Sequence, residues 1–194
     1  MSTPVNADLA VLASVTHHLA ISLAGIDDQQ WALPTPCANW DLRALVDHVT
    51  GGNWFTVAIL DGATSDAALS EARRRFGDAS PSTTQMIRAA ARQLDAFQKP
   101  RALSRSWDHV AGRLVGSEIL RLRLHDLIVH AWDIDRTLST TARLPLDLAH
   151  WGVTELALNS LGSIHFGLVD LDLGHDDGRP DIAYLRAFGR EPLE

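Results

Sequence analysis

Asp126 and His130 are the residue pair with the clearest capacity for chemistry, because they set a carboxylate and an imidazole four positions apart. They belong to the segment LRLHDLIVHAWDI, residues 122–134, whose composition is typical of a helix. Residues four apart lie on one helical face, one turn apart, so both side chains could reach a single ion. The pair indicates part of a metal site, which requires a third ligand.

His48 is the best candidate for that third ligand. It lies in another helical segment, DLRALVDHVTGG, residues 41–52. Apolar residues recur around it at helical spacing and place it on the face that we expect to point inward. These apolar residues are Leu42, Leu45, Val46 and Val49.

A metal is not the sole interpretation of Asp126. Aspartate and histidine at helical spacing more often form an exposed ion pair or include a histidine that is hydrogen-bonded in the core. The neighbours of Asp126 are largely apolar, and burying a carboxylate without a partner is costly, so Asp126 needs a cation. Arg121 or Arg123 could supply that positive charge in place of a metal.

Other residues could join or flank the site. Asp133 follows His130 by three positions and could be a fourth ligand, although we favour it as an acceptor that orients an imidazole. Cys37 precedes His48 by enough residues to sit about two helical turns away, so we interpret it as a structural loop thiol. The tryptophans that flank these segments, and could together wall a pocket, are Trp40, Trp54 and Trp132.

The remaining histidines are weaker candidates. His125 lies five residues from His130, roughly 140° around the helix, so we expect it to face outward or to pack between helices. His17 or His18, in the first helical segment, could approach the interior as an alternative ligand. The histidines interpreted as loop or surface residues are His109, His150, His165 and His175.

Hydrophobic periodicity predicts long helices over residues 8–24, 41–60, 83–97, 117–138 and 145–166. Asp41 should cap the second of them, and Ser82 or Thr83 the third. Shorter features are expected elsewhere: a helix around 67–75, an extended piece or a loop over 103–107, and a helical clasp over 182–188. No strand pattern has comparable strength. We therefore expect an all-α bundle with four long helices in its core, and one domain over residues 1–194.

Composition and charge exclude several classes of function. The net charge of −7 leaves no broad basic surface for nucleic acid, and the acidic run 170–181 should be a solvated loop. No apolar run reaches the roughly 18 residues that a membrane span needs. Asp8 falls where a signal peptide would be apolar, and the single cysteine suits a reducing compartment, so we expect a cytoplasmic protein.

Three segments of the sequence resemble one protein family. WALPTPCANWDLRALVDHVTGG, IVHAWDIDRTL and YLRAFGREP are similar to the DinB-like metal-binding superfamily, and within it to the actinobacterial-type subgroup related to the N-terminal domain of mycothiol-dependent maleylpyruvate isomerase. The resemblance spans essentially the whole chain. It implies a DinB-like four-helix bundle that holds a divalent metal, zinc or alternatively nickel, through His48, Asp126 and His130. The segment YLRAFGREP marks the subgroup, and the resemblance gives it no chemistry.

The sequence departs from the isomerase pattern in two ways. Glutamate stands in that pattern where Asp126 stands here, so the ion must lie nearer the helix or be bound with altered geometry. The sequence also ends without the isomerase's additional C-terminal domain. The resemblance therefore does not carry over maleylpyruvate isomerisation itself.

Three protein ligands would leave a coordination position open, which is a catalytic arrangement. With mycothiol as the thiol implied by the resemblance, we expect a thiol-dependent transferase or isomerase that presents a metal-bound thiolate to a small electrophile. The alternatives are a hydrolase that uses metal-activated water, with Asp133, Asp47 or His125 as base, and a non-catalytic metal- or ligand-binding bundle. The expected partners are small molecules, with no nucleic acid or membrane, and related bundles suggest a monomer or a homodimer.

Overall fold

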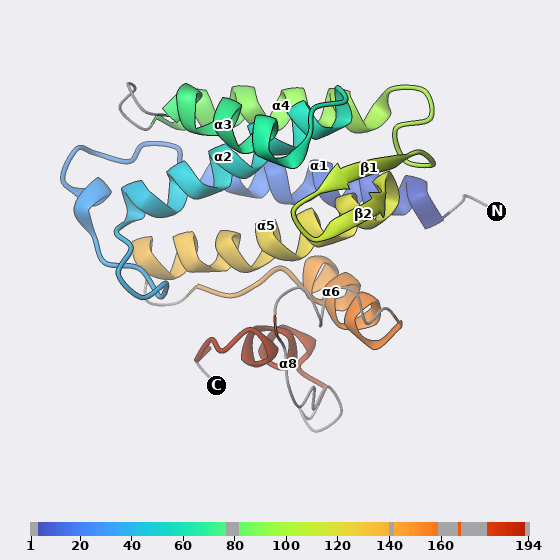
Figure 1. Ribbon diagram of the computed structural model, residues 1–194. Coiled ribbons are helices and arrows are strands. Elements are labelled where there is room, and N and C mark those ends of the chain that lie inside the picture. The colour runs from blue at the N-terminus through green and yellow to red at the C-terminus, as the bar shows by residue number, and fades with distance from the viewer. Residues whose placement is uncertain (1–3, 77–81, 140–141, 159–166, 168–177, 193–194) are drawn as a thin grey trace.

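Four long helices form the centre of the protein in a computed structural model that describes residues 4–76, 82–139, 142–158, 167 and 178–192. They are α1 (Pro4–Ser22), α2 (Leu42–Leu60), α4 (Thr83–Gln98) and α5 (Gly116–Leu138). α2 packs against α4 and α5, and α1 packs against the same two helices, which closes the bundle (Figure 1). The predicted all-α, DinB-like bundle is confirmed.

Side chains close the first turns of these helices as the sequence predicts. The Asp41 carboxylate accepts a hydrogen bond from the Ala44 amide at 2.8 Å, at the start of α2. The Ser82 hydroxyl accepts one from the Gln85 amide at 3.1 Å, at the start of α4. Both bonds satisfy amides that have no acceptor within the helix, so the starts of α2 and α4 follow from local sequence.

A further helix, α3 (Ser65–Phe76), lies along α2. The sequence predicts a helix over 67–75, and the observed one is slightly longer at both ends. Leu69, Ala72 and Arg73 share one of its faces because they are spaced by three and four residues. That face turns toward the pocket described below.

A β-hairpin precedes α5, where the sequence predicts an extended piece or a loop over 103–107. The strands are β1 (Ser106–His109) and β2 (Gly112–Val115), paired antiparallel with His109 opposite Gly112. The prediction was wrong about the extent, because the first strand begins later and has a partner strand. The hairpin is anchored by the Trp107 indole, which donates to the Ala102 carbonyl at 2.9 Å.

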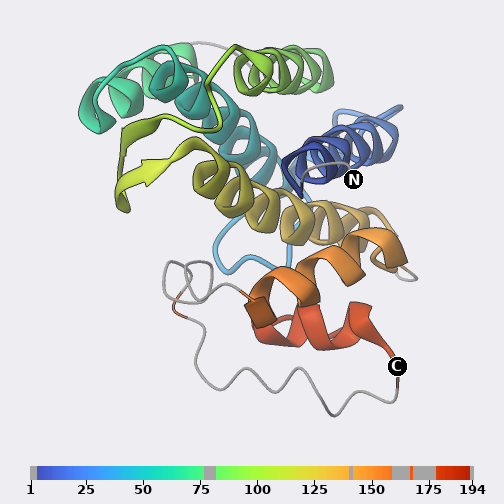
Figure 2. The same ribbon diagram turned by 90° about the vertical axis from the view of Figure 1, so that its right-hand side faces the viewer.

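Two further helices, α6 (Leu146–Leu158) and α8 (Pro180–Ala187), pack against each other on the outer side of α5 (Figure 2). Tyr184 of α8 lies against Gly152 of α6, where a Cβ atom would come within 2.3 Å of the tyrosine ring. The Tyr184 hydroxyl lies 2.8 Å from Nδ1 of the buried His125 on α5. His125 therefore packs between helices, one of its two predicted environments.

The other predicted boundaries agree with the structure within a few residues. The helix predicted over 8–24 is α1, that over 117–138 is α5, and the clasp over 182–188 is α8. The helix predicted over 145–166 begins as expected, but residues 159–166 lie outside the described residues, as does most of the acidic run 170–181. Within the described residues, no helix has the length and apolar character needed to cross a membrane.

Candidate metal centre

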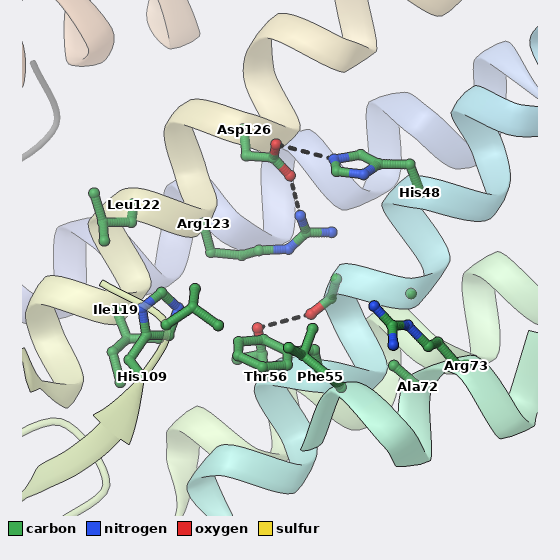
Figure 3. A pocket seen from close by; sticks show the side chains of 14 residues that line it. His48, Phe55, Thr56, Ala72, Arg73, His109, Ile119, Leu122, Arg123 and Asp126 are labelled. Atoms are coloured by element: carbon green, nitrogen blue, oxygen red, sulfur yellow. Dashed lines mark hydrogen bonds and ion pairs between the residues drawn. The ribbon is translucent and has the colours of Figure 1, made fainter. Parts of the chain in front are cut away.

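Three side chains proposed as ligands converge between α2 and α5. Nε2 of His48 lies 3.3 Å from Oδ1 of Asp126, and Nε2 of His130 lies 3.4 Å from the same oxygen. The imidazole centroids of the two histidines are 4.9 Å apart, and one ligand atom from each of the three residues lies within 4.8 Å of the others. Figure 3 shows His48 and Asp126 pointing toward each other across the gap between their helices.

These separations suit a small divalent ion. Nitrogen and oxygen ligands about 2.0–2.1 Å from a tetrahedral zinc ion lie roughly 3.3–3.4 Å from one another. Both separations from Asp126 Oδ1 have this value. Two imidazoles and one carboxylate are also a donor set that zinc and nickel accept. The three side chains therefore fit a zinc or nickel ion, and metal binding itself stays a prediction.

Arg123 supplies the alternative partner for Asp126 that the sequence left open. Its Nη1 donates to Oδ2 of Asp126, while Oδ1 faces the two imidazoles. The same buried guanidinium donates to the Val49 carbonyl at 2.6 Å, to Asn53 Oδ1 at 2.9 Å and to Gln93 Oε1 at 3.1 Å. Arg121 has a different role. It binds Asp8 at 3.0 Å, on the α1 side of α5.

Position 52 allows Arg123 to lie where it does. A Cβ atom on Gly52 would come within 2.5 Å of Arg123 Nη1. The glycine in the middle of α2 therefore leaves the space that the guanidinium fills. This role could not be predicted from sequence, because neither residue stands out from its local pattern.

The charges of Asp126 and His130 stabilise each other. Burial alone would raise the pKa of Asp126, but Arg123, His130 and His48 outweigh it and hold that pKa well below its usual range. Burial alone would lower the pKa of His130, but Asp126, Asp133 and Cys37 outweigh it and raise that pKa well above its usual range. In the absence of a metal, the structure thus favours an Asp126 carboxylate beside a protonated His130.

Asp133 holds the opposite edge of the His130 ring. Its Oδ2 lies 2.9 Å from Nδ1 of His130, as expected for an acceptor that orients an imidazole and leaves Nε2 for other partners. Arg190, beyond α8, donates to both oxygens of Asp133, at 2.8 and 2.7 Å. The C-terminal segment YLRAFGREP, which was given no chemistry, therefore supports the site through Arg190.

Cys37 is closer to the site than its distance along the chain suggested. Its Sγ lies 3.2 Å from Asp133 Oδ2 and 3.8 Å from Nδ1 of His130. Cys37 lies in a loop, as predicted, and this loop before α2 folds back over α5 and brings the thiol beside Asp133 and His130. Cys37, His130 and Asp133 form a second group of ligand type, on the far edge of the His130 ring.

His48 and the flanking tryptophans are placed differently from the prediction. His48 is 39% exposed and lies at the rim, where the sequence predicts an inward position. The Trp40 ring centroid lies 4.9 Å from that of His48, so Trp40 does wall the site. Trp54 instead lies beneath the guanidinium of Arg75, and Trp132 is buried in the core.

The remaining histidines that the structure describes lie away from the three ligand candidates. His17 is exposed, and His18 binds Asp135 at 2.6 Å. His150 is exposed on α6. His109, predicted as a loop or surface residue, belongs to β1 and lines the pocket described next. His165 and His175 lie outside the described residues.

A pocket of about 500 Å³ opens beside the ligand candidates. His48, Asp126 and Arg123 form part of its wall, and α3 and the hairpin form the opposite parts. Most of the remaining lining is apolar: Phe55, Leu69, Ala72, Val110, Ile119 and Leu122. Neither Asp47 nor His125, two of the candidate bases for hydrolysis, lines it.

Comparison with known proteins agrees with this description. Two relatives by sequence are uncharacterized proteins of Mycobacterium tuberculosis, MT0763 of strain CDC 1551 / Oshkosh and Rv0738 of strain ATCC 25618 / H37Rv. Each is 27% identical to this chain over 135 residues, which are 67% of this chain and 66% of the relative. The chain thus spans just under two thirds of the length of these relatives.

Solved structures share the fold. A crystal structure of a histidine-to-alanine mutant of mycothiol-dependent maleylpyruvate isomerase matches with a TM-score of 0.64 and 17% identity. A second crystal structure of that isomerase matches with a TM-score of 0.59 and 16% identity. Both matches cover 79% of this chain and 69% of the other.

The family comparison covers the helices that carry the candidate ligands. The model of the family described as the mycothiol maleylpyruvate isomerase N-terminal domain matches residues 12–135, from α1 to near the end of α5. This range includes His48, Asp126 and His130 and is well over half of the chain. The resemblance to this family is confirmed over residues 12–135, which contain the first of the three segments and most of the second, whereas YLRAFGREP lies beyond the matched range. The chain belongs to the mycothiol maleylpyruvate isomerase N-terminal domain family.

Proposed function

We propose that this protein is a divalent-metal-dependent transferase or isomerase that uses a thiol cofactor of the mycothiol type on a small electrophile. The observation that supports this most is the position of three ligand atoms, within 4.8 Å of one another, at the wall of a largely apolar pocket. Membership of a family named for a mycothiol-dependent isomerase supports the choice of thiol. A bound zinc or nickel ion would lower the pKa of the thiol and so supply a thiolate nucleophile near neutral pH.

The residues of the chain have separate tasks in this proposal. Arg123 occupies Oδ2 of Asp126 and so leaves Oδ1 directed at the imidazoles. Asp133 accepts from Nδ1 of His130, which keeps the Nε2 lone pair of the neutral ring available. The apolar wall of the pocket excludes water from the electrophile, which limits competing hydrolysis.

A non-catalytic bundle is the second candidate, and one observation favours it. Arg123 already neutralises Asp126, so the partly buried carboxylate is satisfied without any metal. Hydrolysis has less support, because Asp133 is held by Arg190 and the other two candidate bases do not line the pocket. We also propose that the chain forms a single domain that acts on small molecules.

Metal analysis of protein purified without chelator tests the site. We expect close to one zinc or nickel ion per chain, and loss of that ion in His48→Ala and in His130→Ala. The control is His17→Ala, which changes an exposed histidine on α1. Retention of the ion in both ligand variants would remove the metal site.

Conjugation of monochlorobimane with and without mycothiol then tests the thiol. We expect turnover that requires mycothiol and that disappears with His48→Ala. Turnover that ignores the thiol would count against the transferase or isomerase, and a stoichiometric metal without any turnover would favour the non-catalytic bundle.

A further inference from the structure

Three consecutive arginines of α3 have different partners. Arg74 binds the Glu71 carboxylate at 2.6 Å, and Arg75 binds the same carboxylate at 2.7 Å. Arg75 also lies 4.1 Å above the Trp54 ring. Arg73 has no carboxylate partner among the described residues, and it is the one of the three that lines the pocket beside the metal centre.

Among the residues that the structure describes, none compensates the positive charge of Arg73 in that pocket. The charged residues of the lining are Arg73, Arg123 and Asp126, and the last two are paired with each other. Figure 3 shows the Arg73 guanidinium reaching from α3 toward the interior of the pocket, across from Asp126 on α5. The charge of Arg73 is therefore available to a ligand that enters.

The rest of the wall is suited to an apolar body. The ring of Phe55 on α2 meets the ring of His109 on β1 edge to face, with centroids 5.4 Å apart. Nδ1 of His109 accepts a hydrogen bond from the Ala111 amide at 3.2 Å, which holds the ring in place as part of this wall. Ile119 and Leu122 of α5 complete a surface that would exclude water from a hydrocarbon or aromatic group.

We propose that this pocket binds an electrophile composed of an apolar body and one carboxylate, and that Arg73 selects the carboxylate. The identity of this ligand as the electrophile rests on the proposed function, whereas its binding does not require turnover. The apolar body lies along Phe55 and Ile119, and the carboxylate meets Arg73 at the α3 wall. Arg73 is thus a specificity-determining residue, separate from the three ligand candidates.

The test compares 2-naphthoate with its neutral analogue 2-naphthamide, by equilibrium dialysis against the full chain. We expect the wild-type protein to bind the acid about fivefold more tightly than the amide, the effect of one solvated ion pair. Arg73→Gln should bring the two affinities together and leave amide binding unchanged. The matched control is Arg74→Gln, one residue along the same helix, which should keep the fivefold preference.

Two outcomes would overturn the proposal. One is equal binding of acid and amide by the wild-type protein. The other is a preference that survives Arg73→Gln but disappears after chelator treatment, because the carboxylate would then sit on the metal. Failure of the proposed function looks different: the acid preference and its dependence on Arg73 would remain, while mycothiol-dependent turnover would be absent.

Discussion

Two carboxylates of helix α5, Asp126 and Asp133, lie seven residues apart, and each is bound by one arginine. Arg190 occupies both oxygens of Asp133. Arg123 occupies one oxygen of Asp126 and leaves the other to the imidazoles. Both carboxylates have a pKa below the ordinary value despite burial, so charge alone does not distinguish them. The geometry of the arginine does distinguish them: Oδ1 of Asp126 has no contact with its arginine, whereas both oxygens of Asp133 do, so we call Asp133 the anchor carboxylate.

Replacing each arginine with methionine should reveal the largest difference between the two arginine–aspartate pairs, in the free energy of unfolding. Arg123→Met leaves Asp126, Asn53 and Gln93 without a shared buried donor, and we expect a loss of about 3–5 kcal/mol in the free energy of unfolding. Arg190→Met should cost about 1–3 kcal/mol, since Arg190 is partly exposed and water can replace it. Urea unfolding of metal-free protein measures both. A larger loss at Arg190 would reverse the comparison.

Asp133→Asn should weaken metal binding without removing a ligand. The amide accepts less strongly from Nδ1 of His130, so we expect the affinity for zinc to fall by about 10- to 100-fold, as measured with a competing chelator. Asp135→Asn is the control, because it removes the same charge two residues later on α5 and contacts His18 instead. Equal zinc affinities for Asp133→Asn and wild type would show that Asp133 has no influence on metal binding by His130.

Metal affinity should rise with pH because His130 lies between the two carboxylates. Burial lowers its pKa, but Asp126 and Asp133 outweigh burial and raise it above the ordinary value, so below this raised pKa an incoming ion must displace a proton. We expect up to about a tenfold gain in affinity per pH unit, which levels off above the raised pKa.

The metal-free protein should respond to pH in the opposite direction. The stabilisation from protonated His130 is fully present below the pKa of an unfolded histidine and is lost as the pH rises through the folded value. For the metal affinity, titration calorimetry of metal binding in buffers of different ionisation enthalpy measures the proton that the ion displaces from His130. An affinity independent of pH would contradict a protonated His130.

Cys37→Ser should have the smallest effect. A serine hydroxyl can still donate to Asp133, so we expect stability to change by less than about 1 kcal/mol and the metal content to be unchanged. If Cys37→Ser lost the ion while His48→Ala kept it, the ion would belong to the group of Cys37, His130 and Asp133.

Local spacing explains how much of the site could be predicted. Asp126 and His130 lie on one helix, so a four-residue interval suffices to bring them together. His48 could be found as a candidate from the periodicity of α2, but its exposure could not. Periodicity identifies a helical face, and His48 lies where that face meets the pocket at the edge of the bundle.

Contacts between distant segments explain what could not be predicted. Arg190 reaches Asp133 across 57 positions of sequence, and Cys37 reaches it across 96. Both contacts depend on how the end of α8 and the loop before α2 pack on α5. The hairpin strands have four residues each, too few for an alternating pattern to stand out.

Gly52 destabilises α2 as an isolated helix but is needed for packing in the folded protein. Glycine in the middle of a helix costs roughly 0.5–1 kcal/mol relative to alanine, and α2 carries Gly51 and Gly52 at its centre. Gly52→Ala should therefore make an isolated α2 peptide more helical. In the whole protein the added methyl group would collide with Arg123 and break its hydrogen bond to Asp126. The effect of this single substitution therefore reverses in sign between peptide and protein. The hydrogen atom at Gly52, where any other amino acid has a Cβ atom, allows Arg123 to bind one oxygen of Asp126 and leave the other to the imidazoles.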